Sequence, residues 1–135
     1  MKQLLVSLLL CALPCFALAE TECNRLLFGG WSHHTDGAYD YNESHNMVGL
    51  QCNSISVMRF NNSYGDESYG IGYDWVGTTV GPVDLGAYAG LWSGYEGYDY
   101  GRPVGGLRAR VNLGDLGVVL TSAFNITTLH LEYKF

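Results

Sequence analysis

The sequence has few of the residues that helical, nucleic-acid-binding or metal-binding proteins depend on. Its 135 residues include only seven lysines and arginines against 13 aspartates and glutamates, so it offers no basic surface for nucleic acid. The four histidines are not spaced as a zinc motif, and no metal site is expected. After residue 19 no run of about twenty apolar residues remains, which excludes a membrane-spanning helix. Eighteen glycines, ten tyrosines and three tryptophans instead favour β-structure.

Residues 1–19 have the features of a secretory signal peptide. A lysine precedes the apolar run LLVSLLLCAL, and the small residues ALA precede the expected cleavage site after Ala19. Pro14 directly before Cys15 argues against a lipoprotein signal. Cleavage leaves residues 20–135, one domain with six basic and 13 acidic residues and a net charge of −7.

Apolar and polar residues alternate with a period of two in eight segments, which predicts eight strands with one apolar face each. The segments are 25–34, 41–53, 55–64, 67–77, 83–93, 104–112, 116–122 and 127–135. Their even number, the aromatic residues at their ends and the alternation of short turns with longer loops predict an all-β, eight-stranded antiparallel transmembrane β-barrel of a Gram-negative outer membrane. A secreted soluble β-sandwich or a lipocalin-like barrel is the alternative.

The last segment, TTLHLEYKF, carries the clearest alternation and ends on Phe135. We expect it to close the barrel against the first strand. Its hydrophobic–x–aromatic–x–Phe ending resembles the signal that outer-membrane barrels present to their assembly machinery. The expected partners are therefore that machinery and membrane lipid, and the barrel is expected to be a monomer.

The two cysteines outside the leader suggest a strand register. If the first hairpin turns around residues 35–40, the sequence positions of two residues that face each other add up to 75. The positions of Cys23 and Cys52 also add up to 75, so these two cysteines are expected to face each other. The oxidising periplasm permits a disulfide between them, and two free thiols are the alternative. This register turns Trp31 and His33 outward.

The same register turns a set of polar and small residues into the lumen. The inward residues of the first two segments are Gly30, Ser32, His34, His45, Met47, Gly49 and Gln51. On the third segment we place Arg59 in the lumen because an arginine facing lipid is costly, and this choice brings Ser63 inward with it.

Charge and size divide the expected lumen into two halves. The periplasmic half receives charged residues that can pair with one another, namely Asp74, Asp84, Arg110, Glu132 and Lys134. The outer half receives small or apolar residues, namely Gly70, Gly90, Trp92, Gly106, Val119 and Thr128. A hollow of this kind could hold an acyl chain, and simple filling by side chains is the alternative.

Polar residues from three neighbouring strands meet at the outer rim. His34, His45, Asn62 and Ser63 are expected at one level. A serine beside a histidine is the minimum for acyl transfer, because the imidazole can take the hydroxyl proton. The same residue types are also ordinary in loops.

Four short motifs, taken in order, resemble the lipid A palmitoyltransferase family PagP. They are YNE at 41–43, FNNSY at 60–64, GIGYDW at 70–75 and the final YKF. The resemblance implies an eight-stranded outer-membrane barrel that moves a palmitoyl chain from a phospholipid to lipid A without a cofactor. It also implies that Ser63 matches the catalytic serine of the family, and that His33 or His34 matches its histidine.

The sequence departs from that family at several positions. Asn62 replaces an aspartate and cannot carry its negative charge, and Asp74 replaces the glycine at the floor of the acyl pocket, which suggests a shorter chain or none. The amphipathic helix before the first strand is missing. Pro103 is the only candidate for the prolines that interrupt strands in the family.

These observations predict roles for the rim residues. His34, which the register turns inward, accepts the proton of Ser63, Asn62 positions the imidazole or polarises the ester carbonyl, and the amides of the NSYG turn bind the oxyanion. Tyr41, Asn42 and Glu43 are expected to hold the rim in place. Two functions compete: an acyltransferase or acyl hydrolase, and a non-enzymatic barrel whose loop SGYEGYDYGRPV binds a surface partner or shields lipopolysaccharide.

Overall fold

The chain forms one closed antiparallel barrel in which every strand pairs with its sequence neighbours and the last pairs with the first. The computed structural model describes residues 21–37 and 39–135. The strands are β1 (Cys23–His34), β2 (Ser44–Cys52), β3 (Ile55–Asn61), β4 (Glu67–Val80), β5 (Val83–Trp92), β6 (Arg102–Leu113), β7 (Leu116–Ala123) and β8 (Ile126–Lys134). The predicted all-β, eight-stranded fold is confirmed, and the closed barrel excludes a β-sandwich. The predicted leader lies outside the described residues.

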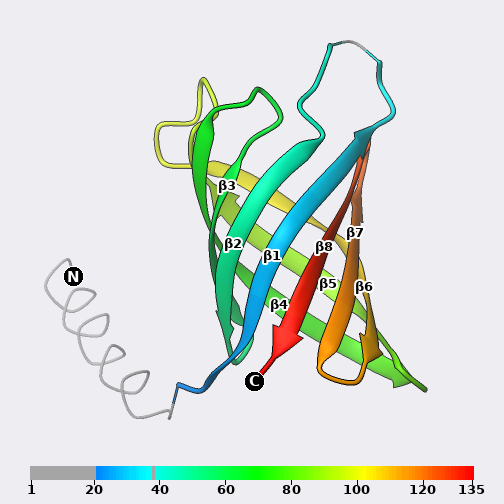
Figure 1. Ribbon diagram of the computed structural model, residues 1–135. Helices are drawn as coiled ribbons and strands as arrows, with labels where there is room; N and C mark the ends of the chain where they lie inside the picture. Colours follow the sequence, from blue (N-terminus) through cyan, green and yellow to red (C-terminus); the bar gives the residue numbers. More distant parts are fainter. Residues whose placement is uncertain (1–20, 38) are drawn as a thin grey trace, which may run out of the picture.

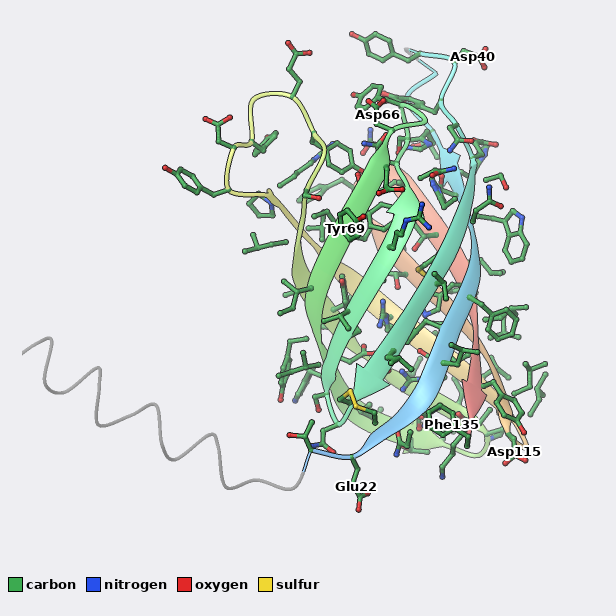
Figure 2. The ribbon with its side chains drawn as sticks, turned by 60° about the vertical axis from the view of Figure 1, so that its left-hand side comes forward. Glu22, Asp40, Asp66, Tyr69, Asp115 and Phe135 are labelled. Atoms are coloured by element: carbon green, nitrogen blue, oxygen red, sulfur yellow. A yellow bond between two sulfur atoms is a disulfide. The ribbon has the colours of Figure 1, made fainter. Side chains whose placement is uncertain are left out.

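The two ends of the barrel differ (Figure 1). Long loops join β1 to β2 and β5 to β6 at one end, and the strand ends near Cys23 and the carboxyl terminus lie at the other. Figure 2 shows Asp40 and Asp66 at the loop end, and Glu22, Asp115 and Phe135 at the opposite end. We call these the loop end and the terminal end. Within the described residues no helix is long and apolar enough to cross a membrane.

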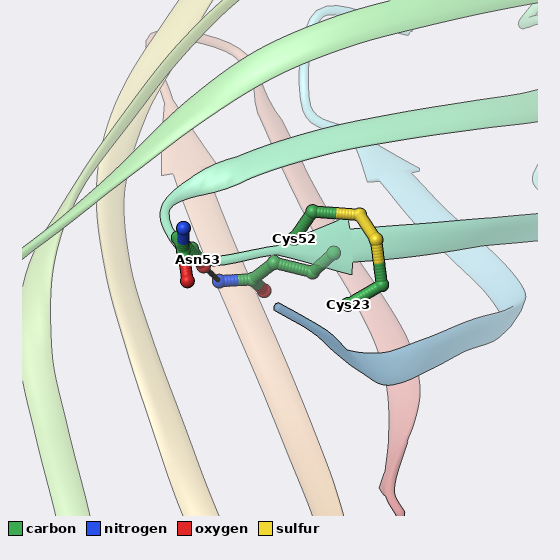
Figure 3. Close-up of a disulfide and its surroundings, with 4 residues drawn as sticks. Cys23, Cys52 and Asn53 are labelled. Atoms are coloured by element: carbon green, nitrogen blue, oxygen red, sulfur yellow. Dashed lines mark hydrogen bonds between the residues drawn. A yellow bond between two sulfur atoms is a disulfide. The ribbon is translucent and has the colours of Figure 1, made fainter. Parts of the chain in front are cut away.

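The predicted disulfide is confirmed at the terminal end. Cys23 pairs with Cys52 across β1 and β2 and is bonded to it (Figure 3). Next to the bridge the amide of Asn53 donates to the carbonyl of Glu22 at 2.9 Å. The bridge fixes the start of β1 to the end of β2.

The register predicted from the cysteines holds at both ends of β1 and fails between them. The pairs Cys23–Cys52 and Trp31–Ser44 have numbers that sum to 75, whereas the pair Phe28–Val48 sums to 76. The register against β2 changes twice, between Cys23 and Arg25 and again between Gly29 and Trp31. On the other side of β1, Gly29 and Gly30 stand opposite the single residue His130 of β8.

This arrangement is a β-bulge, and both glycines have positive φ angles, 82° and 97°. Residues five apart on a regular strand face opposite sides, yet Leu27 and Ser32 are both buried in the lumen. The bulge therefore reverses the alternation of β1 and turns Ser32 and His34 inward while Trp31 and His33 stay outside.

The expected inward position of Arg59 is wrong. Arg59 lies on the outer face near the end of β3, where its Nε donates to Glu67 at 2.9 Å, and the Tyr69 hydroxyl donates to the same carboxylate at 2.6 Å. The prediction assigned a free-energy cost to an unpaired arginine that faces lipid. Arg59 avoids that cost because it is paired with a carboxylate and lies close to the strand end. Ser63 is nevertheless buried, because β3 ends at Asn61 and the chain turns inward beyond it.

The terminal half of the lumen is filled by charged side chains, as predicted. Arg110 donates to Glu132 at 2.8 Å and to Asp74 at 3.0 Å, and Arg108 donates to Asp74 at 2.7 Å. Asp84 lies at the edge of this network, 3.9 Å from Arg110. Lys134 is exposed and does not belong to it. Because each buried charge faces an opposite one, the network closes this end of the lumen with a polar plug.

Removal of one member of the plug should destabilise the barrel strongly. Glu132→Ala leaves Arg110 and Arg25 without their shared partner, and an uncompensated buried charge costs about 3–5 kcal/mol. Urea unfolding of the folded barrel in detergent micelles measures the loss. Asp99→Ala supplies the control, because Asp99 lies exposed in the loop after β5 and its loss should leave the unfolding free energy nearly unchanged. Equal losses in the two variants would contradict the assignment of a buried plug.

Candidate active site at the loop end

A cavity of about 250 Å³ opens at the loop end above the polar plug. Its walls are mainly apolar and its mouth carries the histidines and serine singled out in the sequence. The residues of the apolar walls include Met47, Met58, Phe60, Trp92 and Val104. The residues of the mouth include His34, Tyr41, His45, Ser63, Tyr95 and Arg102.

Tyr88 forms the floor of the cavity. Its ring lies against Gly72 and Gly90, where an added Cβ would meet the hydroxyl at 2.2 and 2.8 Å. The Arg108 guanidinium lies 4.2 Å from the ring centroid, and the indole of Trp92 donates to the Tyr88 hydroxyl at 3.3 Å. Tyr88 and Arg108, which both line the cavity, therefore form its boundary with the plug.

Gly70 and Gly90 do not line the cavity, which corrects the expectation from the sequence. An added Cβ at Gly70 would lie 2.9 Å from the Trp92 ring, so this glycine makes room for the indole. Gly90 makes room for Tyr88 in the same way. Trp92 and Thr128 do line the cavity, as expected. The glycines admit large side chains instead of leaving space empty.

Ser63 and His34 meet at the mouth. The hydroxyl Oγ of Ser63 lies 3.2 Å from Nε2 of His34, although the residues are 29 apart in the chain. Ser63 comes from the turn after β3, and His34 is the last residue of β1. The His34 ring stacks on Tyr41 with 3.9 Å between centroids. Its Nδ1 is buried and has no hydrogen-bond partner among the described residues.

His33 points away from this pair. Its Nδ1 lies 3.5 Å from Glu43 on the exposed side of the rim. Glu43 also accepts a hydrogen bond from the backbone amide of His34 at 3.4 Å. Of the two candidate histidines, the structure brings only His34 to Ser63.

Asn62 does not lie against the imidazole, as the sequence had suggested, but within the loop that carries Ser63. Its amide is fully buried and donates to Ser68 and to the carbonyl of Gly94, while its oxygen accepts from the amides of Tyr64 and Asp66. These four bonds use the whole capacity of the side chain. Asn62 holds the loop that presents Ser63, and the structure does not bring its amide to His34.

The turn amides expected to form an oxyanion hole are largely engaged within the turn. Tyr64 donates to the Asn62 side chain at 2.9 Å, and Gly65 donates to the Asn62 carbonyl at 2.9 Å. Asn62 itself donates to the carbonyl of Asp66. The Ser63 amide donates none of these hydrogen bonds.

The motif Tyr41-Asn42-Glu43 ties the rim together. Asn42 donates from its backbone to the Ser63 carbonyl at 2.8 Å and from its side chain to the Asn62 carbonyl at 3.0 Å. The Tyr41 hydroxyl donates to Asp36 at 3.2 Å. Burial and this carboxylate raise the pKa of Tyr41, so the ring against His34 stays uncharged.

Tyr95 completes the surroundings of Ser63 and was not singled out in the sequence. It is buried in the loop after β5, with the Arg102 guanidinium 5.0 Å from its ring centroid. Burial raises the pKa of Tyr95, against the opposing effects of Arg102 and Ser63. Its phenol therefore stays protonated beside the serine.

A second serine and histidine lie next to the first pair. Nε2 of His45 is 2.7 Å from Oγ of Ser32, and Nδ1 of His45 is 2.6 Å from the backbone carbonyl of Asn61. The sequence placed both residues inside the barrel but did not pair them. The two glycines before Trp31 were the available signal, because the bulge that they form turns Ser32 toward His45.

In comparisons with known proteins, no family model matches the sequence and no curated relative is significantly similar to it. The likeness to the palmitoyltransferase family therefore rests on the four short motifs. Fold and site define the class of molecule, a small closed barrel with serine–histidine pairs at the mouth of an apolar cavity. Among the described residues there is no cluster of three side chains that could bind a metal ion.

Substitution of Gly30 should disturb both pairs. An added Cβ would lie 3.2 Å from that of His45 and 3.1 Å from that of Met47, in a backbone with φ of 97°. Gly65→Ala is the control, since its φ is 86° and its Cβ would meet nothing, so it carries only the strain of about 1–2 kcal/mol. We expect Gly30→Ala to lower the unfolding free energy further and to shift the imidazole NMR signals of His45. Equal effects of the two variants would show that close packing at Gly30 is unimportant.

Proposed function

We propose that the protein is an outer-membrane barrel that transfers or hydrolyses an acyl chain of lipid A or of a phospholipid. The observation that carries this proposal is the contact of 3.2 Å between Ser63 Oγ and His34 Nε2 at the mouth of an apolar cavity. A hydroxyl and an imidazole in hydrogen-bond reach are the minimum for nucleophilic attack on an ester. The apolar walls below them suit a hydrocarbon chain.

In this mechanism the Ser63 hydroxyl attacks the ester carbonyl and His34 takes its proton. The imidazole then gives the proton to the alcohol that leaves, and a second alcohol or water completes the transfer. Tyr41 holds the plane of the imidazole by stacking, and Asn42 fixes the turn that carries the serine. No cofactor takes part.

The size of the cavity favours a short acyl chain. Its 250 Å³ is below the range of about 300–1,000 Å³ typical of ligand pockets. Tyr88 sets the depth by crossing the lumen above Arg108. The charged plug below excludes any longer hydrocarbon, in line with the shorter chain that Asp74 suggested.

An outer-membrane location is supported by the outside of the barrel. Large apolar side chains cover its outer face and aromatic ones lie toward both ends, the arrangement expected of a surface in contact with lipid. The exposed residues include Trp31, Val48, Ile55, Val57, Tyr69, Ile71, Tyr73, Trp75, Leu91, Leu120 and Tyr133. A protein in that location would be exported through a cleaved leader and folded there by the assembly machinery, with its YKF ending as the address.

Resistance to carbonate extraction tests this location against a soluble lipocalin-like barrel. We expect the protein to stay in the membrane pellet and to show heat-modifiable mobility in gels, because its apolar face is solvated by lipid. Release into the soluble fraction, with normal folding, would contradict the proposal.

A second candidate function is supported by the loop after β5. Tyr98 and Tyr100 are exposed there, and 98% of the surface of Tyr100 is accessible to solvent. Asp99 lies between them. A tyrosine-rich loop of this kind could bind a surface partner or shield lipopolysaccharide without any catalysis.

Mass spectrometry of lipid A and phospholipid, from cells with and without the protein, separates the two functions. Removal of a general base costs about 10²–10⁴-fold in rate, so His34→Ala should abolish lipid modification. Ser63→Ala should abolish it as well, because it removes the nucleophile. His33→Ala is the control and should preserve it, because His33 faces Glu43 outside the site. Heat-modifiable mobility verifies that each variant folds.

Two results would contradict the enzymatic proposal. Unchanged lipid spectra in Ser63→Ala relative to an active parent would exclude Ser63 as the acting serine. A parent that alters neither lipid would favour the binding function of the tyrosine-rich loop.

A further inference from the structure

Ser32 and His45 form a second hydrogen-bonded pair that the proposed mechanism does not use. Ser32 Oγ lies 2.7 Å from Nε2 of His45, and Nδ1 of His45 lies 2.6 Å from the carbonyl of Asn61. A carbonyl only accepts hydrogen bonds, so Nδ1 carries the proton and donates it. In the neutral imidazole Nε2 then has a free lone pair, to which the Ser32 hydroxyl donates.

This arrangement meets the criteria for an activated nucleophile. A hydroxyl donates to a base, and a third group fixes the orientation and tautomer of that base. The pair of Ser63 with His34 meets only the first criterion, because Nδ1 of His34 has no partner among the described residues. Its contact is also longer, 3.2 Å against 2.7 Å.

Ser32 lies beside the same cavity. Its neighbours on the inner face of β1, Gly30 and His34, both line the cavity, as does Thr128, its partner across β8. Gly30 has no side chain that could cover the hydroxyl. Ser32 keeps 7% of its surface exposed, and His45 itself lines the cavity.

We propose that Ser32 is a second acyl-accepting serine with His45 as its base. Ser32 Oγ forms a bond to the carbonyl carbon of an ester, and its proton moves to Nε2 of His45. The bond from that carbon to the alcohol oxygen breaks, and the alcohol leaves with the proton from His45. The products are an ester on Ser32 and a free alcohol, and no other reactant is needed.

This inference deepens the proposed function and depends on it for the identity of the ester, but its test needs no lipid. An alkyl fluorophosphonate reacts with activated serines: the serine oxygen bonds to phosphorus, fluoride leaves and the base takes the proton. The folded barrel in detergent micelles is treated with this probe, and the labelled residue is found by peptide mass spectrometry. Ser56 and Ser68 are internal controls, because both are buried in the lumen and the structure records no histidine bonded to either.

We expect label on Ser32 in the parent and in Ser63→Ala, and none on Ser56 or Ser68. His45→Gln should slow labelling of Ser32 by about 10²–10⁴-fold, because the amide can still bond to the hydroxyl but cannot take its proton.

Several outcomes would overturn the inference. They are label on Ser63 alone, no label on either serine, comparable label on Ser56 or Ser68, and undiminished label on Ser32 in His45→Gln. Because the parent protein already gives the decisive result, failure of a variant to fold leaves the test intact. Loss of lipid modification in Ser63→Ala together with absent label on Ser32 would preserve the proposed function and remove only this inference.

Discussion

The bulge at Gly29 and Gly30 is the constraint on which the site depends. Without it, the alternation that buries Leu27 would turn Ser32 and His34 toward the outside of the barrel. The extra residue against β8 reverses the alternation, and the missing side chain of Gly30 lets His45 approach β1. A local backbone irregularity, built from two residues that tolerate positive φ, thereby brings Ser32 and His34 to the mouth where His45 and Ser63 lie.

The rest of the barrel supports that mouth from below and from above. Below it, Tyr88 and the network of Arg108, Arg110, Asp74 and Glu132 fill the lumen, so the apolar cavity is confined to the loop end. Above it, Asn62 and Asn42 hold the turn that carries Ser63. The buried charges are a structural plug and the rim amides are a scaffold, which leaves the imidazoles and hydroxyls as the groups available for chemistry.

Much of the fold could be predicted from the sequence because a period of two is easily read. The eight strands, their closure and the disulfide follow from alternation and one numerical register. The position of Arg59 could not be predicted from that pattern, since it depends on a carboxylate from the neighbouring strand. Gly70 and Gly90 were wrongly expected to line the hollow, because an inward glycine can either leave space or make room for a large neighbouring side chain. Only the packing of Trp92 and Tyr88 shows that the second case applies. The pair of Ser32 with His45 was missed because the two inward side chains are diagonal neighbours across β1 and β2, and only the packing at Gly30 shows that they approach each other.

Cross-strand NOEs of the labelled protein in micelles test the role of the bulge most directly. We predict contacts that join Phe28 to Val48 and to Leu131, and Trp31 to Ser44 and to Leu129. Such a pattern requires a change of register between Phe28 and Trp31 on both sides of β1. Contacts of Trp31 with His45 and Thr128 would instead indicate one continuous register through the strand. That result would place Ser32 and His34 outside the lumen and contradict the account of the site.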